Sequence, residues 1–272
     1  MKKDIIIRNP CVAGQFYPQE KRILLKTLET LVKKDLNRER VWGVISPHAG
    51  YMYSGSIAGK VFAQIEIPEK IILIGPNHSG MGTSFSIMPK GKWLTPLGEV
   101  KIDEEIADTI LKKSKYFKED YLAHLYEHSL EVQLPFIQYV RDNFTFVPLI
   151  VQEASLDEYQ EMGKELADIL IPWQKKILVI ASSDMTHYEP HEETKNKDKL
   201  AIDAILSLNE TLLYNRIKQY KITMCGYAPC IIMLSMVKSW NAKHAELIGY
   251  QTSGDVTGDY ASVVGYAGIV IK

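Results

Sequence analysis

The sequence is poor in cysteine and carries almost no net charge. It has 3 cysteines in 272 residues, and its 32 Lys plus Arg residues balance 33 Asp plus Glu. An odd, sparse set of cysteines favours reduced thiols in a cytoplasmic protein over a disulfide framework. Cys225 and Cys230 also lack the spacing of a C-x-x-C pair. The balanced charge indicates no preference for nucleic acid or an anionic membrane.

Long apolar segments and the common short motifs are also absent. Near the N-terminus only Ile5, Ile6 and Ile7 stand together before Arg8, too few for a signal peptide. No apolar run approaches the roughly 20 residues of a membrane span. There is no G-x-G-x-x-G, Walker A or G-x-S-x-G motif, so nothing local predicts nucleotide binding or a nucleophile elbow.

What the sequence does have is a regular alternation of strand and helix patterns. Apolar, β-branched runs predict strands at 41–45, 70–74, 144–151, 176–181, 245–250 and 261–271. Helices are predicted at 21–34, 54–64, 103–115, 127–140, 155–170, 195–208, 209–219 and 228–240, and a hairpin at 83–100. Ser155 and Glu158 have the spacing of a capping box at the start of the helix at 155–170. Pro135 is expected to kink or interrupt the helix at 127–140. We therefore expect one α/β domain over residues 1–272, with a mostly parallel central sheet flanked by helices.

Three of the predicted strands end in the same way. Each runs into small and polar residues and then a histidine, namely His48, His78 and His187. Because ligands of α/β sheets bind beyond the carboxyl ends of the strands, these histidines are predicted to share one pocket. Imidazole suits both metal ligation and proton transfer. Asp184 precedes His187 by three residues and is expected to orient that ring or to ligate beside it.

Other histidines are less informative. His124 and His128 stand four residues apart, and we interpret His124 as part of a helix surface. His128 is followed by more polar residues than a helix packed on a sheet needs, which makes it a further pocket candidate. His191 follows Pro190, so no regular helix is expected to join it to His187, and we expect it to be solvated.

Two further segments have open interpretations. Cys225 comes just before a predicted helix, where a thiol tends towards the metal-binding thiolate, but cysteine is equally often a small buried hydrophobe. The segment 253–259 contains Asp255 and has the composition of a tight loop. It is either a simple connection or a functional loop near the pocket.

Several motifs together resemble a known family. They are SPHAGY at 46–51, GPNH at 75–78, EHSLE at 127–131, SSDMTH at 182–187 and CG at 225–226, with RNP at 8–10 and GQFYP at 14–18. In this order they resemble the Memo family over nearly the whole chain. Tyr51 and Asn77 lie inside these motifs and, with His128 and Asp255, are additional candidates for the pocket.

The resemblance implies a fold like that of class III extradiol dioxygenases, which cleave catechol rings with non-haem iron. It implies that His48 and His78 are metal ligands, that His187 is the acid/base, and that Cys225 replaces a glutamate ligand. A thiolate in that place favours copper, zinc or thiolate-ligated iron and is itself oxidisable, so ring cleavage is not expected to carry over. Iron or copper is the expected cofactor, with zinc as an alternative. Microbial relatives also imply a functional link to a radical-SAM protein and a third small protein.

The sequence leaves several functions open. The first hypothesis is a metal-dependent enzyme, with redox chemistry as one reaction class, and the second is a protein that holds or delivers iron or copper without catalysis. The third is a module that binds a small molecule, peptide or anionic ligand without metal. A fourth is a hydrolase with Cys225 as nucleophile and His187 as base.

Overall fold

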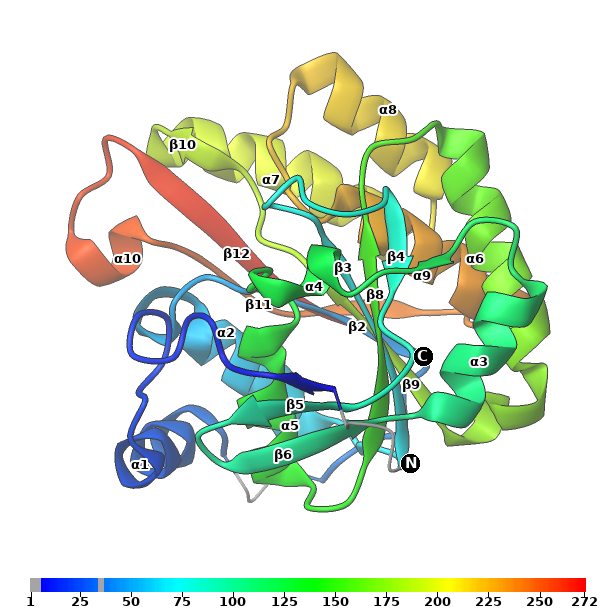
Figure 1. The fold of residues 1–272 in the computed structure, drawn as a ribbon. Helices are drawn as coiled ribbons and strands as arrows, with labels where there is room; N and C mark the ends of the chain where they lie inside the picture. The colour runs from blue at the N-terminus through cyan, green and yellow to red at the C-terminus, as the bar shows by residue number, and fades with distance from the viewer. Residues whose placement is uncertain (1–5, 34–36) are drawn as a thin grey trace.

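One large mixed sheet forms the centre of the protein (Figure 1). The computed structural model describes residues 6–33 and 37–272. The strand order is β1-β5-β6-β8-β3-β9-β2-β12-β10, with β11 paired to β12, β4 to β8 and β7 to β4. The strands are β1 (Ile7–Arg8), β2 (Gly43–Ser46), β3 (Lys70–Pro76), β4 (Phe85–Ile87), β5 (Lys92–Thr95), β6 (Gly98–Ile102), β7 (Lys118–Glu119), β8 (Thr145–Val151), β9 (Ile177–Ser182), β10 (His187–Glu189), β11 (Ala245–Thr252) and β12 (Val263–Ile271).

The middle of the sheet is parallel, and antiparallel pairs occur on either side of it, although the edge strand β1 pairs with β5 in parallel. β8, β3, β9 and β2 run in the same direction, with Ile74 of β3 in register with Leu149 and Ala181. β12 joins β2 in antiparallel pairing, and β5 with β6 forms a hairpin at 92–102, which begins later than the predicted 83–100. Side chains of the parallel strands are almost wholly buried, as expected of strands covered on both faces. The predicted α/β architecture is confirmed.

Helices cover both faces of this sheet. They are α1 (Lys21–Leu31), α2 (Tyr51–Gln64), α3 (Glu104–Lys113), α4 (Leu122–Leu125), α5 (Leu134–Val140), α6 (Leu156–Leu170), α7 (His191–Leu206), α8 (Glu210–Tyr220), α9 (Tyr227–Ser239) and α10 (Gly254–Thr257), with 3₁₀ turns η1 (Glu131–Gln133) and η2 (Ile171–Lys176). α2 packs on β2, β11 and β12 beside α1 and α5, whereas α9 packs on β2, β3 and β9 with α6 behind it (Figure 1).

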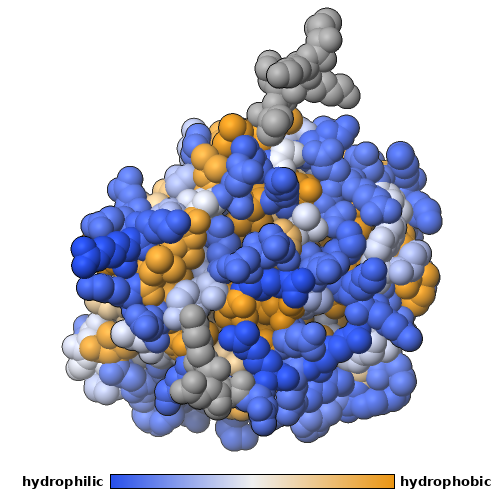
Figure 2. Space-filling view, turned by 90° about the horizontal axis from the view of Figure 1, so that it is seen from below, coloured by the Kyte–Doolittle hydropathy of each residue, from blue (hydrophilic) through white to orange (hydrophobic). Residues whose placement is uncertain are grey.

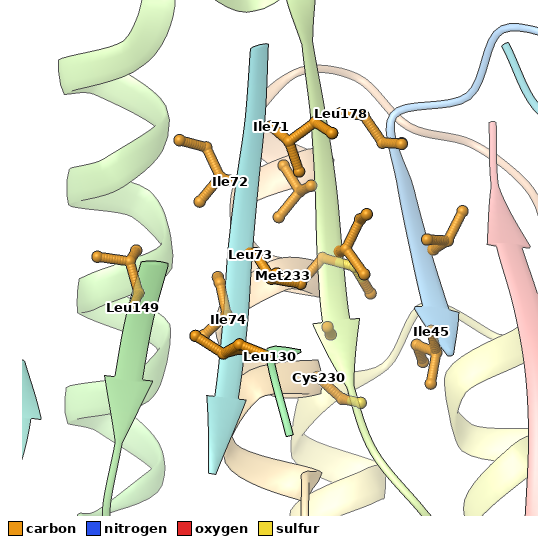
Figure 3. Close-up of a cluster of buried hydrophobic side chains, with 14 of the residues drawn as sticks. Ile45, Ile71, Ile72, Leu73, Ile74, Leu130, Leu149, Leu178, Cys230 and Met233 are labelled. Atoms are coloured by element: carbon orange, nitrogen blue, oxygen red, sulfur yellow. The ribbon is translucent and has the colours of Figure 1, made fainter. Parts of the chain in front are cut away.

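The core between α9 and the sheet is made of aliphatic and sulfur-containing side chains. Figure 3 shows Cys230 and Met233 of α9 among side chains of β3 and β9, including Leu73 and Leu178. All four are fully buried. Burying one such side chain contributes about 1.5–3 kcal/mol, so this layer fixes α9 firmly against the parallel strands.

Some element boundaries differ from those predicted. The helix expected at 127–140 is present only from Glu131, first as the 3₁₀ turn η1 and then as α5 from Leu134, with Pro135 in the first turn of α5. Residues 127–130 form an irregular segment. α2 begins at Tyr51, three residues early, and α7 begins directly after Pro190. Position 34, the end of the first predicted helix, lies outside the described residues. The capping box at Ser155 is present as predicted.

Figure 2 shows one face, on which hydrophilic side chains predominate and hydrophobic ones gather in small patches. Over residues 6–33 and 37–272, none of the helices combines the length and apolar composition that crossing a membrane requires.

Candidate metal centre

Three histidine rings meet at the carboxyl edge of the parallel strands. His48 follows β2, His78 follows β3, and His128 comes from the irregular segment before η1. Their ring centroids are 4.6 Å (His78–His128), 5.2 Å (His48–His78) and 5.5 Å (His48–His128) apart. One nitrogen from each ring lies within 4.8 Å of the other two, so the described residues contain a group able to hold a metal ion.

The orientation of His48 is fixed by Ser182. The Ser182 hydroxyl donates its proton to the Ser129 carbonyl at 2.6 Å and accepts from Gln133 Nε2 at 2.8 Å. His48 Nδ1 lies 2.9 Å from the same hydroxyl oxygen and must therefore be the donor in that pair. The tautomer with the proton on Nδ1 leaves a lone pair on Nε2, which is the form that binds metals.

The orientation of His78 is fixed by a buried carboxylate. Glu127 is fully buried and accepts from His78 Nδ1 at 2.9 Å, from the His78 backbone N–H at 2.5 Å and from Ser129 N–H at 2.8 Å. A carboxylate behind a histidine is the usual support of a metal-ligating ring. Burial alone would raise the pKa of Glu127, but the hydrogen bond and charge of His78 outweigh it and lower this pKa to about 2. Burial likewise opposes the change at His78, where Glu127 raises the pKa.

His48 and His128 favour the neutral form. Burial, followed by the neighbouring histidines, lowers the pKa of His48 well below its usual range. Burial also lowers the pKa of His128, which stacks on His78 and lies 4.8 Å from the ring of Phe16. Because metals compete with protons for imidazole nitrogen, neutral rings at neutral pH suit ligation.

Cys225 lies beside one of these rings but is not among the three residues whose ligand atoms all lie within 4.8 Å of one another. Where the predicted ligand set has Cys225, this group has His128. Cys225 precedes α9, and its sulfur lies 3.2 Å from His48 Nε2. Burial and then the charge of Asp184 raise the pKa of its thiol well above the usual range. The protein alone therefore keeps Cys225 as a thiol, despite its place near a helix N-terminus.

Asp184 supports the backbone of His48 and not the ring of His187. Its carboxylate accepts from the N–H groups of His48 at 2.7 Å and Ala49 at 3.3 Å, and burial raises its pKa to about 6. His187 Nδ1 instead lies 3.0 Å from the Thr223 carbonyl. Since a carbonyl only accepts, Nδ1 carries the proton and Nε2 the lone pair.

A cavity of about 710 Å³ opens beside the histidines. His48, His78, His128, His187 and Asp184 all contribute to its wall. The rest of the wall is Gln15, Phe16, Ala49, Gly50, Tyr53, Tyr188, Ser253, Thr257, Asp259, Ser262, Val264 and Tyr266. It therefore combines titratable groups with aromatic side chains in a space large enough for a small organic molecule.

Three sequence candidates lie elsewhere. The Tyr51 hydroxyl donates to the Val132 carbonyl in the core. The Asn77 side chain holds its own loop, with Nδ2 donating to the Met81 carbonyl, and borders a neighbouring pocket together with Cys225. Asp255 accepts from the N–H of Thr252, the last residue of β11, at 2.8 Å. None of the three belongs to the wall of the histidine cavity.

Two histidine expectations need correction. His124 is fully buried, not on a helix surface, because its Nε2 faces Ser86 Oγ at 3.2 Å and Trp93 lies against its ring. His191 is only partly exposed, and its Nδ1 lies 3.0 Å from Thr252 Oγ1.

The sequence interpretation also missed the supporting groups. Glu127 and Ser182 were visible in the motifs but had no assigned role. Glu131 forms a buried ion pair with Arg8 and accepts from the Tyr17 hydroxyl at 2.6 Å and from Cys11 N–H at 2.8 Å. Through Glu131 the N-terminal segment is tied to the loop that carries His128.

The fold and the site together define a class of α/β protein in which three histidine rings converge at the carboxyl edge of the parallel strands. The chain matches the family described as Memo-like protein over residues 8–270 and belongs to it. It is 40% identical to a MEMO1 family protein of Methanopyrus kandleri, covering 97% of this chain and 99% of that one. It is 42% identical to a MEMO1 family protein of Aquifex aeolicus, covering 97% and 98%.

A solved structure supports the fold alone. The crystal structure of an uncharacterized protein from Escherichia coli K12 aligns with a TM-score of 0.54 at 12% identity. The alignment covers 85% of this chain and all of the other.

Proposed function

We propose that this Memo-like protein is a metal-dependent enzyme whose metal is held by His48, His78 and His128. The observation that carries the proposal is that one nitrogen of each ring lies within 4.8 Å of the other two, beside a cavity of about 710 Å³. Three protein ligands that leave positions open to a substrate are typical of catalytic centres, whereas structural sites are closed.

The residues present fit a first-row transition metal. Imidazole nitrogens suit iron, copper and zinc, and they bind magnesium or calcium poorly. The Nδ1 atoms of His48 and His78 are engaged by Ser182 and Glu127, so both rings offer Nε2 without rearrangement. We propose iron or copper as the cofactor, with zinc as the alternative, and such a metal would supply Lewis-acid or redox chemistry.

Cys225 and His187 have separate proposed roles. Cys225 lies 3.2 Å from His48 Nε2, close enough to become a fourth ligand when a cation lowers the pKa of its thiol. The His187 lone pair on Nε2 can accept a proton from a bound substrate, while Thr223 holds the ring. Asp184 acts on the site by holding the backbone of His48 in place.

A non-catalytic metal-binding function is the second candidate. The observation that favours it is the oxidisable sulfur of Cys225 directly beside His48, since a thiol ligand is vulnerable in an oxygen-using enzyme. Both candidate functions require the bound metal, and they differ in whether the protein converts a substrate.

Metal content of protein purified anaerobically without an affinity tag tests the shared claim. We expect about one equivalent of iron, copper or zinc, and loss of that metal in the His48→Ala/His78→Ala variant. His244→Ala is the matched control, because His244 is exposed and lies outside the cavity wall. Protein that takes up no ion, even after anaerobic reconstitution, would contradict the proposal.

A second comparison separates the two candidates. A His187→Gln variant retains the three proposed ligands, so an enzyme keeps its metal and loses turnover of small organic substrates. If the metal-loaded wild-type protein turns over none of a broad panel of substrates, the result favours the non-catalytic metal-binding function.

A further inference from the structure

Tyr188 has a backbone conformation that its position in the chain does not explain. Within the described ranges, four non-glycine residues have positive φ: Tyr188 (61°), Leu208 (51°), Lys221 (50°) and Asn241 (72°). The last three each follow the end of a helix, where a left-handed residue closes the final turn. Tyr188 instead lies inside strand β10, and a bulky residue pays a steric cost in this region.

The strain accompanies a β-bulge. His187 pairs with Val264 of β12, but Glu189 pairs with the adjacent Val263, so Tyr188 is the extra residue. Neighbouring contacts hold the bulge from both sides. His187 N–H donates to Thr223 Oγ1 at 2.7 Å, and the Glu189 carboxylate forms an ion pair with Lys197 at 2.6 Å.

The bulge changes which way Tyr188 faces. Consecutive residues of a regular strand point to opposite sides, yet His187 and Tyr188 both belong to the wall of the histidine cavity. Bulges next to functional sites often redirect a side chain in this way.

Tyr188 makes few contacts within the fold that would offset the energetic cost of its strained backbone. Its side chain is 78% exposed, and in the described part of the chain its hydroxyl has no hydrogen-bond partner. Its ring makes an edge contact with His187 at 5.7 Å. An exposed aromatic side chain held in a strained conformation is a candidate for ligand contact.

The rest of the wall indicates what such a ligand is. Phe16, Tyr53 and Tyr266 supply further aromatic surface, and the lining contains no lysine or arginine. Asp184 and Asp259 are its carboxylates. Aromatic walls favour a planar group that stacks on them, whereas any anionic part of a ligand would be held by the histidines or their metal.

We propose that Tyr188 is a specificity-determining residue that stacks on a planar aromatic or conjugated group of the ligand at the mouth of the histidine cavity. The inference rests on the proposed function only in placing the ligand in the same cavity. The bulge is then the device that brings the ring next to His187.

Matched uncharged probes test this directly. Benzamide and cyclohexanecarboxamide share size and amide but differ in planarity, and ligand-detected NMR titration gives both dissociation constants. We expect wild-type protein to prefer benzamide, and Tyr188→Gly to reduce that preference about three- to tenfold, the range of one aromatic contact. Tyr188→Phe should keep it, because the ring remains.

Controls separate binding from folding and from the metal. Tyr188→Gly should unfold at the same temperature as wild type or higher, because glycine tolerates positive φ. Asn241→Gly changes another left-handed residue outside the cavity wall and should leave the preference intact. Metal content should be unchanged in Tyr188→Gly. Absence of metal from the wild-type protein and from every variant would refute the proposed function and not this inference. Equal preference in wild type and Tyr188→Gly, or no benzamide binding up to its solubility limit, would overturn the inference.

Discussion

At the scale of single residues, the site depends on groups that touch the histidines from behind. Glu127 accepts three hydrogen bonds, two of them from His78. Ser182 fixes the tautomer of His48. These contacts preset which nitrogens face the cavity, so the energetic cost of orienting the rings is met during folding and not during metal binding.

Replacing Glu127 tests this support. Glu127→Gln keeps the shape but removes the charge and one acceptor oxygen, so we expect metal affinity to fall about 10- to 100-fold. Competition with a chelator measures the loss. Glu153→Gln removes a carboxylate that is 78% exposed and should not change affinity. Equal affinity in both variants would show that Glu127 does not support the metal ligands.

His124 predicts a pH dependence of stability. Burial lowers its pKa from 6.5 to about 3, so between these values the unfolded chain binds a proton that the folded protein does not. Stability therefore falls as pH drops from 6.5 towards 3, by up to about 1.4 kcal/mol per pH unit from this residue. Denaturant unfolding of His124→Phe should show a shallower fall over this range. His244→Phe, at an exposed position, should follow wild type, and parallel curves for all three proteins would refute the assignment.

Residue roles were only partly predictable from sequence. The strand-end rule placed His48, His78 and His187 at one cavity, because strand direction determines where the carboxyl ends lie. The partner of Asp184 was not predictable, since it depends on how β9 approaches the loop after β2. The burial of His124 likewise follows from the β4 and β5 segments packing over it, which a helical spacing argument does not see.

At the scale of elements, the irregular segment 127–130 determines where His128 lies. It lies against the ends of β3 and β9 and brings His128 onto the ring of His78. The helical spacing of apolar residues predicted a helix here. The hydrogen bonds that Glu127 accepts from His78, and the one that Ser129 donates to the Pro76 carbonyl, compete successfully with helix formation.

Gly75 permits the close approach of this segment. A Cβ on Gly75 would lie 2.6 Å from both Ser129 Oγ and Leu130 Cδ2. We expect Gly75→Ala to destabilise the protein by about 1–3 kcal/mol and to weaken metal binding, because His128 must shift. Gly50→Ala meets nothing closer than 3.5 Å and serves as the control. Thermal unfolding and metal titration measure both effects, and a Gly75→Ala protein with wild-type values would contradict the packing argument.

At the scale of the whole molecule, the parallel middle of one mixed sheet gathers groups from distant parts of the chain. His48, His128 and Cys225 stand far apart in sequence, yet all lie at the same edge. The alternation of strand and helix was readable because it follows from local periodicity. The antiparallel additions of β12, β10 and β4 were not, since strand pairing depends on long-range packing.

This architecture predicts that metal stabilises the entire fold. Ligands that bind only the native state add about 2.7 kcal/mol at a concentration of 100 times Kd. For a chain of this size the midpoint of thermal unfolding should rise by about 5–10 °C. The His48→Ala/His78→Ala variant should show no rise, and a similar rise there would place the metal elsewhere.

The central claim is that His48, His78 and His128 hold one metal ion. An anomalous difference map from anaerobic crystals loaded with Fe(II) or copper tests it most directly. We predict a single strong peak bonded to one nitrogen of each ring at about 2.0–2.2 Å. The same map shows whether Cys225 is a fourth ligand. No peak at these three rings, or a peak only at surface histidines such as His244, would contradict the account.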